Sequence, residues 1–168
     1  MQKKQAYILV SMVVAMFSFL MPLFAMHQSP VYEKEIIMTA KGEFDIQMKP
    51  QTDKDFEMGR MTLEKTFRGD LSGSSKGQML SVRTAVDGSA GYVAIEVFTG
   101  TLVGKAGAFH LQHSGTMSQG AAAATITVIP DSGTDELAGL SGEMAIDIVD
   151  GQHVYDFTYK LSPAENEN

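Results

Sequence analysis

The sequence predicts an all-β domain, an eight-stranded antiparallel meander closed into a barrel, that follows an N-terminal signal segment. Sixteen glycines divide the chain at short intervals, and the runs between them are rich in residues that favour strands. No long stretch repeats its apolar residues with a helical period. One pair of neighbouring strands is apolar on both faces, which a closed and covered sheet explains.

The N-terminal segment has the pattern of a secretory signal. Two lysines at positions 3 and 4 precede an uncharged run over residues 6–26, which is the order of the basic and apolar regions of a signal peptide. Ala25 fits the small residue before a cleavage site, so we expect residues 1–25 to be removed. The alternative is an uncleaved anchor, because about 20 apolar residues span a bilayer. We therefore expect a periplasmic or secreted protein or, with the segment retained, an N-terminally membrane-anchored one.

The remainder divides into a polar tether at residues 26–35, the β-barrel domain at 36–161 and a disordered tail at 162–168. The strands are expected at residues 36–48, 60–71, 76–87, 90–103, 107–118, 121–129, 141–149 and 152–161. One short helical turn fits residues 131–140. Closing these strands into a barrel removes the free edges that would otherwise pair with other chains.

In two hairpins the turn residues predict which residues of the two strands lie opposite each other. Asp150-Gly151 is a strong two-residue turn signal and sets Ile148 opposite His153. In the other hairpin a loop at Lys105-Ala106 sets Phe98 opposite His113, and one face then holds Tyr92, Ala94, Glu96, Phe98, Leu102, Phe109, Leu111, His113 and Met117. The opposite face is rich in valine, isoleucine and threonine, so we expect a lumen on one side and a second subunit on the other.

Charge and cysteine content narrow the possible partners. The formal net charge is −7, and the basic residues form no cluster that would bind nucleic acid or an anionic membrane surface. The chain has no cysteine and therefore no disulfide. The stability of an exported domain would then depend on its core alone. We expect a small apolar ligand and a homo-oligomer as partners, no nucleic acid, and membrane contact only through an uncleaved signal segment.

Glu96 and His113 are the candidate catalytic pair. In the expected register they share one face of the hairpin on a diagonal, within reach of each other, and that face is either the lumen or a subunit interface. A carboxylate among apolar groups needs a partner or a raised pKa, so the pair fits a general acid and base. Tyr92, Glu96, Phe98 and His113 are the candidate ligand-binding residues. The alternative is a structural role, with Glu96 paired to His113, Arg83 or a tyrosine.

Three other patterns are weaker. His110 and His113 are three residues apart and point to opposite faces of a strand, so they cannot share a metal ion. Asp131 begins an Asp-Ser-Gly-Thr run that resembles an aspartic protease motif but consists of turn residues. Met58 and Met61 have the spacing of a copper(I) thioether pair, although core packing is the simpler interpretation. We expect no metal and no cofactor.

Three long runs, "GRMTLEKTFRGDLSGSSKGQMLS", "GSAGYVAIEVFTGTLVGKAGAFHLQHSGTM" and "PDSGTDELAGLSGEMAIDIVDGQHVYDFTYKL", resemble a bacterial family of unknown function. The resemblance covers Ala40 to Leu161. It implies an eight-stranded barrel like that of allene oxide cyclase, and it implies no activity. The export signal departs from the family pattern, because many relatives look cytoplasmic.

Three functions therefore remain open. The first is a non-enzymatic barrel that binds a small apolar ligand in its lumen, and this is the one we favour. The second is a structural homo-oligomer with a packed lumen. The third is an isomerase, cyclase or lyase that uses Glu96 and His113 as acid and base.

Overall fold

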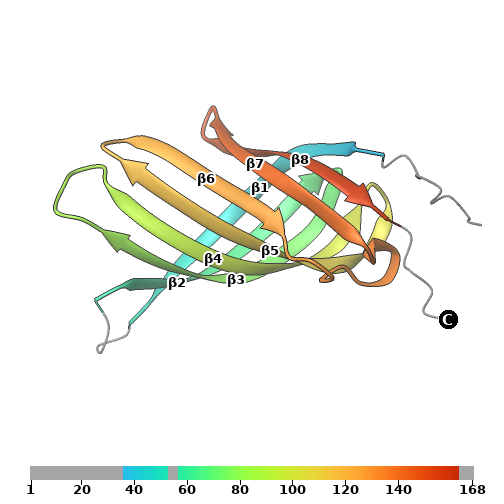
Figure 1. The fold of residues 1–168 in the computed structure, drawn as a ribbon, viewed down its shortest axis with the longest axis horizontal. Helices are drawn as coiled ribbons and strands as arrows, with labels where there is room; N and C mark the ends of the chain where they lie inside the picture. Colours follow the sequence, from blue (N-terminus) through green and yellow to red (C-terminus); the bar gives the residue numbers. More distant parts are fainter. Residues whose placement is uncertain (1–35, 53–56, 163–168) are drawn as a thin grey trace, which may run out of the picture. The chain divides into compact units, whose positions relative to one another are not determined.

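The computed structural model describes residues 36–52 and 57–162. The predicted signal peptide and tether lie outside the described residues, as does the predicted tail beyond residue 162. The described chain forms eight strands and one short 3₁₀ helix, η1 (Figure 1): β1 Met38–Gln51, β2 Gly59–Gly69, β3 Leu71–Arg83, β4 Ala90–Leu102, β5 Lys105–Ser118, β6 Ala121–Val128, η1 Asp135–Leu137, β7 Leu140–Val149 and β8 Gln152–Leu161.

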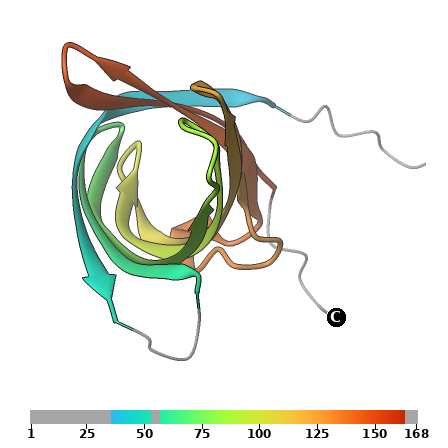
Figure 2. The same cartoon turned by 90° about the vertical axis from the view of Figure 1, so that its left-hand side faces the viewer.

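The strands form a closed antiparallel barrel, which confirms the predicted fold class. Each strand pairs with the next, and β1 pairs with β8 through contacts such as Ala40 with Phe157. Figure 2 shows the resulting ring of strands. Strand β3 begins at Leu71, earlier than predicted, because the chain turns at Gly69-Asp70 and the serine-rich stretch that follows pairs with β2 and β4. Within the described residues, no helix is long and apolar enough to cross a bilayer.

The core lies inside the barrel. Alternate residues of each strand point inward, and Leu137 of η1 is fully buried where the β6–β7 connection covers one end. Aromatic rings contact one another across this end, with ring centroids 5.5 Å apart for Phe67 and Phe98 and 5.0 Å for Phe98 and Phe109. We call the opposite end, where the β3–β4, β5–β6 and β7–β8 hairpins turn, the mouth.

The register of the β4–β5 hairpin corrects the sequence-based one. The turn is Val103-Gly104, so Phe98 lies opposite Phe109, four residues from the predicted partner His113. Both turn residues have positive φ, 48° and 81°, as a type I′ turn requires. Valine rarely adopts this conformation, so Val103-Gly104 is not recognisable from the sequence as a turn. Because four is an even number, the residues predicted to share a face still share one, and this face points into the barrel.

The Asp150-Gly151 turn is confirmed, with Ile148 opposite His153. It also has positive φ at both positions, 51° and 83°. The two hairpins show why one register was predicted correctly and the other was not, since Asp-Gly is a common sequence for this turn and Val-Gly is not.

The barrel wall is incomplete between β6 and β7. Among the described residues, the register joins these strands only through Thr127 and Glu143. We call the space between residues 121–126 of β6 and 144–149 of β7 the seam. In Figure 1 the β7–β8 hairpin stands apart from β6 along this seam. The seam widens toward the mouth, because Thr127 and Glu143 lie near the covered end of their strands.

Candidate functional site

A group of four polar side chains lies inside the barrel. Lys65, Ser75, Glu96 and His113 project from the neighbouring strands β2, β3, β4 and β5, and none is more than 5% exposed. We call them the polar quartet. Each occupies an inward position of its strand, alternating with outward residues. Side-chain alternation therefore places charged groups in the lumen.

Glu96 is the centre of the polar quartet. Its Oε1 accepts a hydrogen bond from Lys65 Nζ at 2.8 Å and lies 3.0 Å from His113 Nε2. Its Oε2 accepts a hydrogen bond from the Ser75 hydroxyl at 2.9 Å. Both carboxylate oxygens thus have partners, as a buried charge requires.

The charges of the polar quartet balance one another. Burial by itself would raise the pKa of Glu96, but the hydrogen bond from His113 and the charge of Lys65 outweigh it and lower that pKa to about 2. The Lys65 ammonium also lies 4.9 Å from the ring centroid of Phe44 and 5.9 Å from that of Phe67. Glu96 is therefore an ionised carboxylate held by a cation that rests against two aromatic rings.

The predicted contact between Glu96 and His113 is present, and both side chains face the lumen. Sequence reasoning missed Lys65 and Ser75. A signal existed for Lys65, which alternates with Leu63 and Phe67 and so occupies an apolar inward row. Arg83, an alternative partner of Glu96, lies at the far end of β3 and is exposed.

The other two predicted ligand residues have different surroundings. Phe98 is fully buried in the aromatic core. Tyr92 is partly buried at the mouth, and its ring covers Gly115, where an added Cβ would lie 2.2 Å from the Tyr92 Cε1 atom. Burial and the charge of Glu96 raise the Tyr92 pKa. The ligand role of these residues stays a prediction.

Gly77 makes room for Glu96. It lies directly opposite Glu96 on β3, and a Cβ there would be 2.6 Å from Glu96 Cβ and 2.5 Å from the Ile95 carbonyl oxygen. Any larger residue would push the two strands apart. The glycine thus allows the carboxylate side chain to turn into the lumen beside Ser75 and Lys65.

The structure also places two other sequence patterns, the His110–His113 spacing and the run that begins at Asp131. His110 is exposed on the outer face while His113 is buried inside, and among the described residues no three His, Cys, Asp or Glu side chains group as metal ligands. The Asp131 run is a turn, and the Ser132 and Thr134 hydroxyls accept hydrogen bonds from the backbone N–H groups of His110 and Ala108. This run therefore fastens the β6–β7 connection to β5.

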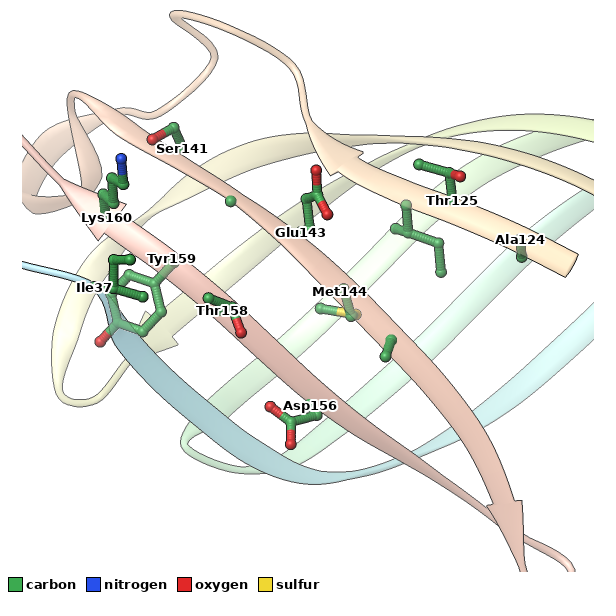
Figure 3. Close-up of a pocket in the computed structure, with 13 residues that line it drawn as sticks. Ile37, Ala124, Thr125, Ser141, Glu143, Met144, Asp156, Thr158, Tyr159 and Lys160 are labelled. Carbon is green, nitrogen blue, oxygen red and sulfur yellow. The ribbon is translucent and has the colours of Figure 1, made fainter.

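A cavity of about 720 Å³ lies at the seam. Figure 3 shows its lining, with Glu143 projecting from β7 toward β6. Ile126, Met144 and Tyr159 are inward-facing core residues that also line the cavity. Polar groups surround them: Thr125, Ser141, Glu143, Asp156, Thr158 and Lys160.

The seam cavity and the polar quartet are neighbours. Ile126 lines the cavity and lies directly opposite His113 in the β5–β6 pairing. Asp156 of the lining forms an ion pair with Lys41 on β1. The cavity therefore combines an apolar floor, which includes the strand partner of His113, with a charged rim.

Comparison with known proteins identifies relatives but no activity. A crystal structure of a protein of unknown function from Shewanella oneidensis MR-1, from the DUF3224 family, is similar with a TM-score of 0.74 and 46% sequence identity, over 77% of this chain and 100% of that one. No curated protein matches. Residues 40–159 match the family described as "Protein of unknown function (DUF3224)". The chain therefore belongs to the DUF3224 family of eight-stranded barrels.

Proposed function

We propose that the protein is a non-enzymatic binder of a small, largely apolar molecule. The seam cavity is the observation that supports this. Its volume of about 720 Å³ lies within the range of roughly 300–1,000 Å³ that small-molecule sites occupy. An apolar floor with a few polar groups around it is also the usual lining of such sites.

The contacts of the cavity suggest how the ligand is oriented. An apolar body would pack on Ile126 and Met144. Its polar end would reach the rim at Glu143, where no hydrogen bond or ion pair to another described side chain occupies the carboxylate. The ligand thus needs an apolar body and a hydrogen-bond donor or cationic group at one end.

Binding is favoured over catalysis because of Glu96. A general base works best when its pKa is near the working pH, whereas Glu96 has a pKa of about 2 and three hydrogen-bonding partners. The carboxylate is therefore a weak base that is already engaged. We propose that it holds His113 and Lys65 in place, and that it does not transfer a proton.

Two further proposals concern the partner and the location. Outward side chains on β3 and β4 form an exposed apolar patch, which we call the outer patch: Leu80, Val82, Val93 and Ile95. We propose that a second copy of the chain covers it. We also propose export and removal of residues 1–25, which the mass of the protein recovered from the periplasm or medium would reveal.

The neutral fluorescent probe N-phenyl-1-naphthylamine tests the binding proposal. Ala124 lines the seam cavity and its neighbour Ala123 does not, so Ala124→Phe should fill the cavity and Ala123→Phe should not. We expect the probe to bind the natural chain and the Ala123 variant, and to bind the Ala124 variant at least tenfold more weakly. Equal binding by all three would place the ligand site elsewhere and overturn the proposal.

A further inference from the structure

One carboxylate on the rim of the seam cavity has no partner among the described residues. Glu143 lines the cavity and projects from β7 toward β6 (Figure 3). No hydrogen bond or ion pair to another described residue engages its side chain. Asp156 on the same rim differs, because it forms an ion pair with Lys41. The carboxylate of Glu143 therefore keeps its capacity to accept hydrogen bonds from a bound molecule.

Hydroxyl groups lie around this carboxylate. Thr158 is directly opposite Glu143 on β8, a position at which the two Cβ atoms are about 5 Å apart. Ser141 is two residues before Glu143 and so projects from the same side of β7, and Thr125 lies across the seam on β6. All three hydroxyl residues line the cavity. A protonated primary amine has three N–H donors and no acceptor, so a carboxylate with neighbouring hydroxyls can accept all its hydrogen bonds.

The charges on the rim favour a cation over an anion at this position. Asp156 is a diagonal neighbour of Glu143 across the β7–β8 pair, so two carboxylates line the same part of the cavity. Lys41 balances the charge of Asp156, which leaves the charge of Glu143 without compensation. Lys160 also lines the cavity, but it lies nearer the covered end of the barrel. An anionic group beside Glu143 would be repelled, and the net charge of −7 acts in the same direction.

We propose that the ligand of the seam cavity is an amphiphile with a protonated primary amine at one end of an apolar chain. The ammonium group donates hydrogen bonds to Glu143 and to the Thr158 hydroxyl. The apolar chain packs on Ile126 and Met144, the buried residues of the cavity floor. This inference rests on the proposed small-molecule function and names the head group that the rim selects. An alcohol would donate one hydrogen bond at the same place and would bring no charge.

Displacement of N-phenyl-1-naphthylamine by decylammonium, 1-decanol and decanoate tests the head group, because the three compounds have alkyl chains of similar length. Hydrogen bonds to a charged group are stronger than those between neutral groups. We therefore expect decylammonium to displace the probe from the natural chain at a concentration at least about fivefold lower than 1-decanol. Decanoate should require the highest concentration of the three.

Two variants of β7 assign the preference to one carboxylate. Glu143→Gln removes the charge and keeps the size of the side chain, so it should bind the probe normally and lose the preference for decylammonium over 1-decanol. The matched control is Asp147→Asn, which removes a charge from the same outward row of β7, outside the cavity lining. This control should keep the preference of the natural chain.

The other outcomes separate this inference from the function on which it rests. Equal displacement by the three compounds, or an unchanged preference in Glu143→Gln, would overturn the amine head group and leave the small-molecule site in place. Tightest binding of decanoate would move the head group to Lys160 and overturn it as well. If the probe does not bind the natural chain, calorimetry with decylammonium decides. A one-to-one complex that Glu143→Gln weakens would support the amine site, and the absence of a complex would overturn both proposals.

Discussion

At the scale of single residues, Lys65 and Glu96 show what a charged pair inside a barrel needs. The pair is almost fully buried and 2.8 Å apart. Removing one partner of such a pair leaves an unpaired charge in the interior and typically costs about 3–5 kcal/mol. Replacing both partners should lower the free energy of unfolding by less than the sum of the two single replacements, because no unpaired charge is then left in the interior.

A double-mutant cycle follows from this contact. We expect Lys65→Met and Glu96→Gln each to lower the free energy of unfolding by about 3 kcal/mol. The double variant should lose at least about 1 kcal/mol less than the sum of the two losses. Urea denaturation measures all three, and strictly additive losses would show that the two side chains do not interact.

The pH dependence of stability follows from the lowered pKa of Glu96. The value falls from 4.5 to about 2 on folding, so the ionised carboxylate stabilises the folded protein above pH 4.5, by about 3 kcal/mol. This stability is lost as the pH falls from 4.5 toward 2. Denaturation at a series of pH values should show the loss in the natural chain and a smaller one in Glu96→Gln.

The control for this measurement is Glu43→Gln. Glu43 forms its ion pair with Arg68 at the surface, where both side chains are nearly half exposed. Exposed pairs contribute little, so this variant should keep the pH profile of the natural chain. If it lost the acid dependence as well, Glu96 would not be its source.

At the scale of elements, the β4–β5 turn is held in an unfavourable conformation. Val103 has φ of 48°, which costs a β-branched residue more than asparagine. We expect Val103→Asn to raise the free energy of unfolding by about 1 kcal/mol. Chemical denaturation measures the change.

The same change from valine to asparagine within a strand should lower the free energy of unfolding. Val93 is as exposed as Val103, at 53% against 59%, but it lies in the extended backbone of β4. Asparagine is unfavourable in strands, so Val93→Asn should destabilise the protein. Equal effects at the two positions would mean that backbone conformation does not control the result.

The pairing of β3 with β4 depends on Gly77 in a similar way. A Cβ at Gly77 would meet the Ile95 carbonyl oxygen and Glu96 Cβ, whereas at Gly91 the nearest atom would be 3.9 Å away. Gly77→Ala should cost about 1–3 kcal/mol, and Gly91→Ala should cost little. The melting temperatures of the two variants measure this difference. Similar melting temperatures would contradict the role given to Gly77.

At the scale of the whole molecule, the outer patch suggests how copies associate. Leu80 lies directly opposite Val93, and Val82 and Ile95 flank them, all 43–53% exposed. Contiguous exposed apolar side chains on a folded domain commonly mark an interface. An acidic chain would associate most readily where its surface is uncharged.

Native mass spectrometry tests this association. We expect a homo-oligomer for the natural chain and a monomer for Ile95→Lys, which places a charge in the outer patch. Thr99→Lys introduces the same charge on the same outward row of β4, beyond the patch, and should remain oligomeric. A monomeric natural chain would disprove the proposed interface.

The sequence alone determined the strand order, the barrel and which residues of the β4–β5 hairpin share a face, whereas the structure shows that this face is the lumen. These follow from local information: turn residues, glycine spacing and the alternation of side chains, which an even register error does not disturb. Glu96 and His113 were predicted as a pair because they lie on neighbouring strands of one hairpin.

Only the tertiary structure decided what surrounds that pair and where the wall opens. Lys65 and Ser75 reach Glu96 from β2 and β3, 31 and 21 residues earlier in the chain, and no local pattern specifies which lumen residues meet at one height of the barrel. The seam is set by how far β6 and β7 diverge after a single paired position. Barrel closure and strand stagger fix both features, and these depend on all the strand pairings together.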